Sequence, residues 1–297
     1  MKAHGLALIL LTLPVVAQAQ PAPQPPQVAS EPETVYSDAQ RQKDDQTARR
    51  FVQSLLSPSY TLEGQFSRWK TPICPRVIGM APTAAYVVER RIRDIAQQIG
   101  APLDRHDPCN PDIVIFVTPQ PQTMLDALVA KNHWLFDAGK MKVSYPAQAW
   151  YTNVLHDYNG MPHLDVPWEI ICPDCLTPPP IPANDTWLHT GIQAQMGAAT
   201  ILVNSAAITG MTLGSFADYL ALMTLAQTPA TGRCQPAPSI ANLFLANCSA
   251  DSHTTALSEV DLAMLTALYQ TPDEPEKLQA TRLIGNMRRN LEGNNQK

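Results

Sequence analysis

Two runs rich in β-branched residues constrain the fold more than any other feature of this chain. Asp112–Thr118 reads DIVIFVT and Ala199–Val203 reads ATILV, which is typical of strands buried on both faces. A helical pattern precedes the first run, with Pro82 in its first turn and Gly100 at the position of a left-handed C-terminal cap. The apolar positions of this helix are Ala85, Val88, Ile92, Ile95 and Ile99. Strands that alternate with helices predict an α/β fold, in which the helices pack against a sheet.

The remaining segments fit the same architecture. Val77–Ile78, Ala149–Leu155 and Pro167–Ile171 are predicted strands, and Thr123–Lys131 is a predicted helix. Leu213–Gln227 is apolar nearly all round, which predicts a helix at the centre of the fold. We therefore expect one mixed sheet packed by helices, with α+β as the alternative fold class and a buried central helix near 213–227.

Three further helices are expected outside this alternation. One begins at Ser37 and ends before Pro58, and the last covers Glu276–Leu291. Between them, Ser258 followed by Asp261 has the spacing of a capping box, which predicts the start of a helix that ends near residue 269.

The first nineteen residues have the pattern of a secretory signal peptide. Lys2 supplies a positive charge, Gly5–Val16 is an apolar run too short for a stable membrane span, and Ala17-Gln18-Ala19 suits signal peptidase. No cysteine follows the expected cut, so a bacterial lipid anchor is not expected. The later sequence contains no uninterrupted apolar stretch of membrane-spanning length, so stable membrane insertion after cleavage is not expected either. These features predict a periplasmic or secreted protein.

The domain organisation follows from the same segment. We expect a signal peptide at 1–19, a disordered Pro-rich leader at 20–36, a single α/β domain at 37–292 and a flexible tail at 293–297. The formal net charge of the whole chain is -5, and its short arginine clusters fall on predicted helices. This charge pattern lacks the basic surface that nucleic-acid binding requires.

An even number of cysteines in an exported chain favours disulfides over free thiols. The six are Cys74, Cys109, Cys172, Cys175, Cys234 and Cys248. Six cysteines allow fifteen pairings, and the sequence alone does not choose among them. Because short loops are the easiest to close, proximity favours pairing the first with the second, the third with the fourth and the fifth with the sixth.

The Cys172-Pro-Asp-Cys175 segment invites comparison with thiol oxidoreductases. In those enzymes the first cysteine lies at a helix N-terminus, which stabilises its thiolate. Pro173–Pro182 contains five prolines, so no helix is expected to start here. A structural loop disulfide is the favoured interpretation, and a disulfide-exchange factor is the alternative.

His156, Asp157, His163 and Asp165 form the densest group of side chains that could bind a metal. They fall on or beside a polar loop expected at 157–163, and their spacing matches no ligand pair carried by a helix. Exposed loops often contain such residues without binding a metal, so no metal site is predicted. These four residues remain the candidates if one exists.

Other catalytic patterns are missing from the sequence. It contains no Gly-x-Ser-x-Gly elbow and no glycine-rich phosphate loop, and Ser215 enters an apolar helix with no evident base nearby. No catalytic residue and no cofactor is therefore predicted.

Three segments resemble a group of exported proteobacterial proteins with no assigned activity. They are Arg68–Pro75, Ala199–Gln227 and Ser258–Tyr269, which occur here in the same order. A more distant similarity is to the zincin metalloproteases, whose His-Glu-x-x-His helix follows a strand. When that motif is aligned with Leu213–Gln227, Ala217 and Ala221 take the positions of the zinc-binding histidines, and Asp218 takes the position of the glutamate. This resemblance implies a degenerate, metalloprotease-like member that has lost its zinc site.

Together these observations predict an exported, soluble and non-catalytic protein that binds, or gives structure to, an unknown envelope or extracellular partner. The alternative is a metal-dependent hydrolase whose site is built around His156–Asp165.

Overall fold

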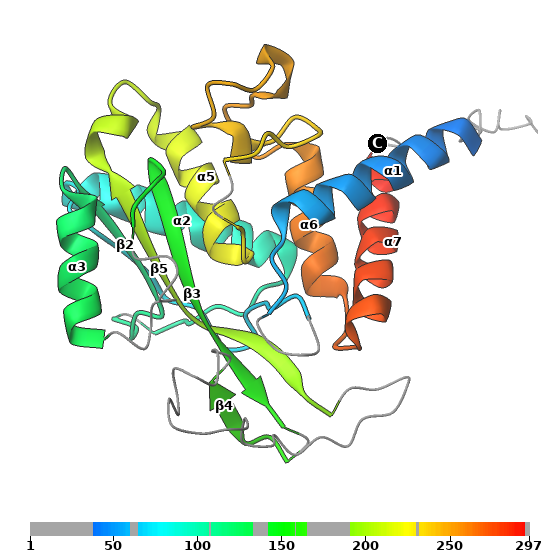
Figure 1. Cartoon of the computed structure of the whole chain (residues 1–297), viewed down its shortest axis with the longest axis horizontal. Coiled ribbons are helices and arrows are strands. Elements are labelled where there is room, and N and C mark those ends of the chain that lie inside the picture. Colours follow the sequence, from blue (N-terminus) through cyan, green and yellow to red (C-terminus); the bar gives the residue numbers. More distant parts are fainter. Residues whose placement is uncertain are drawn as a thin grey trace, which may run out of the picture. The chain divides into compact units, whose positions relative to one another are not determined.

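A mixed sheet of five strands forms the centre of the fold (Figure 1). In spatial order the strands are β1 (Pro75–Ile78), β2 (Ile113–Thr118), β5 (Gln193–Asn204), β3 (Ala147–His156) and β4 (Pro162–Leu164). The first three are parallel, whereas β3 runs antiparallel to both β5 and β4. This computed structural model describes residues 38–59, 65–106, 108–132, 142–157, 159–164, 191–229 and 232–294. It confirms the predicted α/β fold with one mixed sheet.

The two faces of the sheet bury different clusters, because successive residues of a strand point to opposite sides. On one face, Leu202 of β5 and Trp150 of β3 pack with Leu125 of helix α3 (Pro121–Asn132). On the other face, Ile115 of β2 and Ile201 of β5 contribute to the main core. Both central strands are therefore covered on both sides, as their continuous apolar sequences predict.

The main core lies between the sheet and five helices: α1 (Asp38–Leu55), α2 (Pro82–Ile99), α5 (Leu213–Leu225), α6 (Glu259–Gln270) and α7 (Glu276–Asn294). Helix α5 packs beside α2, and every residue of α5 from Ser215 onward is buried. The predicted buried central helix is thus confirmed. It is apolar all round because sheet, helices and a long C-terminal segment enclose it.

Local capping signals set the helix boundaries as expected. Pro82 opens α2, and Gly100 closes it in the left-handed conformation, with φ of 83° and its N–H bonded to the carbonyls of Ala96 and Gln97. The capping box at Ser258 and Asp261 is formed and opens α6. These boundaries depend on short-range chemistry, which explains why the sequence predicts them well.

The strands after β2 differ from the prediction. The expected loop at 157–163 is shorter, because Pro162–Leu164 already forms β4 and pairs with β3. The Asp157 carboxylate accepts the backbone N–H groups of Asn159 and Met161 and so closes a tight turn. The predicted strand at Pro167–Ile171 lies outside the described residues.

All described residues belong to one compact unit, Tyr36–Lys297. The predicted signal peptide and leader precede the first described residue, and α7 continues through Asn294, two residues past the predicted domain end at 292. No helix in the described part of the chain combines the length and apolar character that a membrane span requires.

Candidate functional site

A cavity of about 60 Å³ lies at the meeting point of α1, the start of β3, the second half of α5 and the segment that follows α5. Its lining consists of Ser54, Leu55, Tyr145, Pro146, Ala147, Tyr219, Leu222, Met223, Thr228, Pro229, Gly232, Arg233, Gln235, Ala241, Phe244 and Leu245. A single water molecule occupies roughly 10–15 Å³ of such a cavity. The cavity therefore has room for roughly five water-sized groups.

Aromatic rings shape the walls of the cavity. The rings of Tyr219 and Phe244 meet edge to face, with centroids 4.8 Å apart. Tyr145 lies against Gly232, where an added Cβ would come within 2.7 Å of its ring. A glycine is required at this position both by that close approach and by its φ of 58°.

The hydroxyl group of Tyr219 is the feature that points to a ligand. Three tyrosines, Tyr151, Tyr219 and Tyr269, pack in or against the core, and burial raises the pKa of each, to about 12 for Tyr151. All three hydroxyl groups are therefore neutral hydrogen-bond donors at physiological pH. Tyr151 donates to the carbonyl of Met223 at 2.8 Å, and Tyr269 donates to that of Leu225 at 2.9 Å.

Tyr219 is only 9% exposed and lines the cavity, yet its hydroxyl has no hydrogen-bond partner among the described residues. An acceptor atom placed in the cavity is the kind of group that a tyrosine hydroxyl can bind as a donor.

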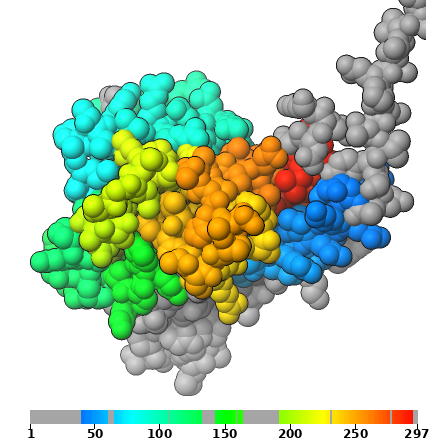
Figure 2. All heavy atoms as spheres, turned by 90° about the horizontal axis from the view of Figure 1, so that it is seen from above, coloured from blue at the N-terminus to red at the C-terminus, as the bar shows by residue number. Residues whose placement is uncertain are grey.

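Hydrogen bonds hold the wall opposite α5 in place. Ser54 of α1 donates to the side-chain oxygen of Gln235 at 2.6 Å, and the Gln235 N–H donates to Asn242 at 2.8 Å. The Cys234–Cys248 disulfide closes the same segment. Figure 2 shows this region in yellow and orange, spread beside α1 in blue. Two hydrogen bonds and one disulfide thus connect the described residues of this wall.

Arg233 is the one charged residue of the described lining, and its side chain is exposed. No ion pair links it to a carboxylate in the described part of the chain. Both residues line the cavity, Tyr219 as a buried and Arg233 as an exposed side chain. An exposed cation in the lining favours a ligand with a negative group beside it.

The four candidate metal ligands do not all lie together. Asp157 and His163 are neighbours, with Oδ2 and Nε2 3.2 Å apart. His163 pairs with Leu155 across the sheet, so His156 projects to the opposite face, where its Nε2 lies 3.3 Å from Gln195. Asp165 lies outside the described residues. In the described part of the chain no three His, Cys, Asp or Glu residues are grouped as a metal site needs.

The residues aligned with the zincin motif have structural contacts. Ala217 and Ala221 are completely buried in the core. The carboxylate of Asp218 accepts two hydrogen bonds from Arg91 on α2 and one, at 2.9 Å, from the backbone N–H of Leu257. It thereby links two helices to the segment before α6.

Replacing Asp218 by alanine is expected to lower the free energy of unfolding by about 2 kcal/mol. The main loss is the unpaired N–H of Leu257, because Arg91 is 44% exposed and its ion pair contributes less. Urea unfolding measures the change. The matched control is Asp94→Ala, which removes an exposed ion pair to Arg90 on the same α2 and should change stability by less than about 0.5 kcal/mol. Equal losses of stability in Asp218→Ala and Asp94→Ala would contradict a structural role for the Asp218 carboxylate.

Two of the three predicted disulfides are confirmed. Cys74 is bonded to Cys109 and Cys234 to Cys248, with Cα atoms 6.0 and 5.5 Å apart. The third predicted pair, at 172 and 175, lies outside the described residues. Ser215, considered above as a nucleophile, donates its hydroxyl to the carbonyl of Thr255 at 2.6 Å.

Sequence reasoning did not single out Tyr219 as a candidate site residue. One signal was available, because a tyrosine in a helix that is apolar all round must find a partner for its hydroxyl. Comparison with protein-family models, with curated proteins and with solved structures finds no match to this chain.

Proposed function

We propose that this chain is exported and acts as a non-catalytic binding protein, whose site is the cavity beside Tyr219. The observation that carries the proposal is Tyr219, which lines the cavity, is only 9% exposed and has no hydrogen-bond partner for its hydroxyl group among the described residues. The ligand is a small acid. Its carboxylate lies at Arg233, its short apolar body contacts Leu222 and Phe244, and a carbonyl oxygen accepts the hydrogen bond from Tyr219.

The lining supports binding and not turnover. Its described residues include no His, Asp, Glu or Cys. Its two aliphatic hydroxyl groups have other partners, since Ser54 bonds to Gln235 and Thr228 to Tyr151. Neither hydroxyl contacts a base that could activate it for nucleophilic attack.

Binding is tested with 4-oxopentanoate and 5-oxohexanoate, each compared with the matching acid that lacks the keto group. The purified mature chain is titrated by NMR or calorimetry. The oxo acids should bind more tightly than the plain acids. In Tyr219→Phe they should lose about fivefold in affinity, because one hydrogen bond contributes about 1 kcal/mol, whereas the plain acids should be unaffected.

The same Tyr219→Phe protein provides its own folding control. Its free energy of unfolding should equal or exceed that of the parent chain, because the deleted hydroxyl has no protein partner. Arg233→Gln should weaken the binding of both the oxo acids and the plain acids. It should leave the affinity for 2-pentanone unchanged, because that ketone has no carboxylate. Absence of binding by every oxo acid at millimolar concentration would refute this ligand class, as would equal affinities in the parent chain and in Tyr219→Phe.

Export is supported by the signal-like segment at 1–19 and by two disulfides in the described chain. Expression of the full chain in a Gram-negative bacterium should deliver a protein that begins at Gln20 to the periplasm or the medium. N-terminal sequencing of each fraction measures this. An uncut chain in the cytoplasm would contradict export and leave the binding test unaffected.

A further inference from the structure

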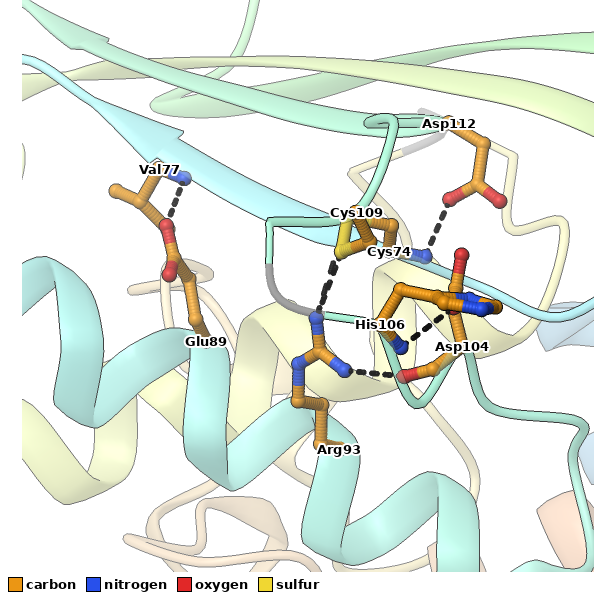
Figure 3. The surroundings of a disulfide bond; sticks show 8 residues. All are labelled: Cys74, Val77, Glu89, Arg93, Asp104, His106, Cys109 and Asp112. Atoms are coloured by element: carbon orange, nitrogen blue, oxygen red, sulfur yellow. Dashed lines mark hydrogen bonds and ion pairs between the residues drawn. A yellow bond between two sulfur atoms is a disulfide. The ribbon is translucent and has the colours of Figure 1, made fainter.

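The guanidinium group of Arg93 lies against the sulfur atoms of the Cys74–Cys109 disulfide (Figure 3). Arg93 of α2 places Nη2 3.0 Å from the sulfur of Cys109 and 3.9 Å from that of Cys74. Its Nη1 donates to the carbonyl of Asp104 at 2.9 Å, which fixes the direction of the guanidinium group. No ion pair joins Arg93 to a carboxylate among the described residues, and its charge acts on Asp104 only as a minor cause of that group's lowered pKa.

The two ends of this disulfide have different surroundings. Cys74 is 1% exposed, and its backbone N–H donates to the Asp112 carboxylate at 2.8 Å. Cys109 is partly exposed and is nearer to Arg93. A negative charge on sulfur is therefore favoured at Cys109, where the cation is close, and disfavoured at Cys74, where a carboxylate lies nearby.

The other titratable groups near the pair belong to one loop. Asp104 bonds to His106, with Oδ1 and Nδ1 2.7 Å apart. That histidine is largely exposed, and the hydrogen bonds it gives lower the pKa of Asp104. Arg93 is therefore the group whose hydrogen bond reaches the sulfur atoms directly.

We propose that Cys74–Cys109 is a thiol-exchange site, which accepts two electrons from an external dithiol and uses Arg93 to stabilise a thiolate on Cys109. This site is separate from the ligand cavity, and neither proposal depends on the other. Arginine beside a cysteine is one of the arrangements that make thiolates available at neutral pH.

The exchange proceeds in two displacements. A thiolate of the dithiol attacks the sulfur of Cys109, the partly exposed member of the pair, the Cys74–Cys109 bond breaks, and Cys74 leaves and takes up a proton. The second thiol of the reductant, after losing its proton to solvent, attacks the reductant sulfur of the mixed disulfide and releases Cys109 as a thiolate beside Arg93. The dithiol ends as a disulfide, having given up two electrons, and the chain gains one thiol and one thiolate.

The test is redox equilibration of the whole mature chain with reduced and oxidised dithiothreitol, followed by alkylation and mass spectrometry of each cysteine. In Arg93→Gln, the equilibrium constant for reduction of Cys74–Cys109 should fall about tenfold. The constant for Cys234–Cys248 in the same molecule should not change. The matched variant Arg90→Gln, which removes an exposed charge from the same helix, should leave both constants unchanged.

A second measurement separates charge stabilisation from a loosened loop. In the reduced chain, the alkylation rate of Cys109 is followed against pH. Arg93→Gln should move the midpoint of this profile to higher pH, whereas a purely structural role would change only the plateau rate. Arg93→Lys should recover part of the shift, because it keeps the charge. An unchanged equilibrium constant and an unchanged midpoint in Arg93→Gln would overturn the proposal.

Discussion

Replacing Cys74 and Cys109 together by serine is expected to lower the free energy of unfolding by about 4 kcal/mol. The two residues are 35 positions apart, and a cross-link over a loop of that length removes roughly this much conformational entropy from the unfolded chain. The bond joins the segment entering β1 to the segment before β2, so it restrains two neighbouring strands. Urea unfolding of the oxidised proteins measures the difference.

The control for this prediction is the other disulfide. Cys234 and Cys248 are 14 positions apart, so the corresponding double serine variant should lose about 3 kcal/mol. A loss of less than about 1 kcal/mol in the free energy of unfolding of the Cys74 and Cys109 double variant would show that this disulfide does not restrain the unfolded chain as expected. If Arg93 stabilises a thiolate, the reduced parent chain should lose less stability than the serine variant at neutral pH, because serine carries no charge for Arg93 to face.

Replacing Asp261 by alanine is expected to lower the free energy of unfolding by about 3 kcal/mol. The Asp261 carboxylate is completely buried and accepts four hydrogen bonds. Two come from the backbone N–H groups of Ile240 and Ser258, both at 2.9 Å, and two come from the hydroxyl groups of Ser239 and Ser258. Alanine leaves the backbone N–H groups of Ile240 and Ser258 and the hydroxyl group of Ser239 without their acceptor, each at a cost of about 1 kcal/mol or more.

Asp261→Asn is the matched control for that variant. Burial raises the pKa of Asp261, so its charged form carries a desolvation cost that the amide avoids. The amide oxygen can also accept the two backbone hydrogen bonds. Asparagine should therefore lose only about 1 kcal/mol by urea unfolding. Equal losses in the alanine and asparagine variants would show that the buried acceptor is not what stabilises this region.

The secondary structure could be predicted wherever the signals are local. These signals depend on residues within or next to one helix. They are the apolar stripe of α2, its C-terminal cap at Gly100 and the capping box at Ser258. The short strand β4 was missed, because its three residues form a strand only by pairing with β3. Strand pairing is a contact between distant segments, and a sequence of three residues carries no periodic signal for it.

The candidate site could not be predicted for a related reason. Tyr151, Tyr219 and Tyr269 look alike in the sequence, and what separates them is whether a backbone carbonyl lies within reach of the hydroxyl. Sequence density also grouped His156 with His163, although strand alternation directs them to opposite faces. A high density of His and Asp residues along the chain predicts an exposed loop better than it predicts that their side chains meet at one metal site.

The sequence by itself determined the α/β class and the buried central helix, because these follow from periodicity and local caps, and short loop closure favoured the two cysteine pairs that the structure shows. Only the tertiary structure decided that Tyr219 faces a cavity, that Asp261 ties α6 to Ser239 and that Arg93 lies against the sulfur of Cys109. The contacts of Asp261 with Ser239 and of Arg93 with Cys109 join residues 22 and 16 positions apart. Their geometry depends on how whole elements pack, which no local pattern of residues specifies.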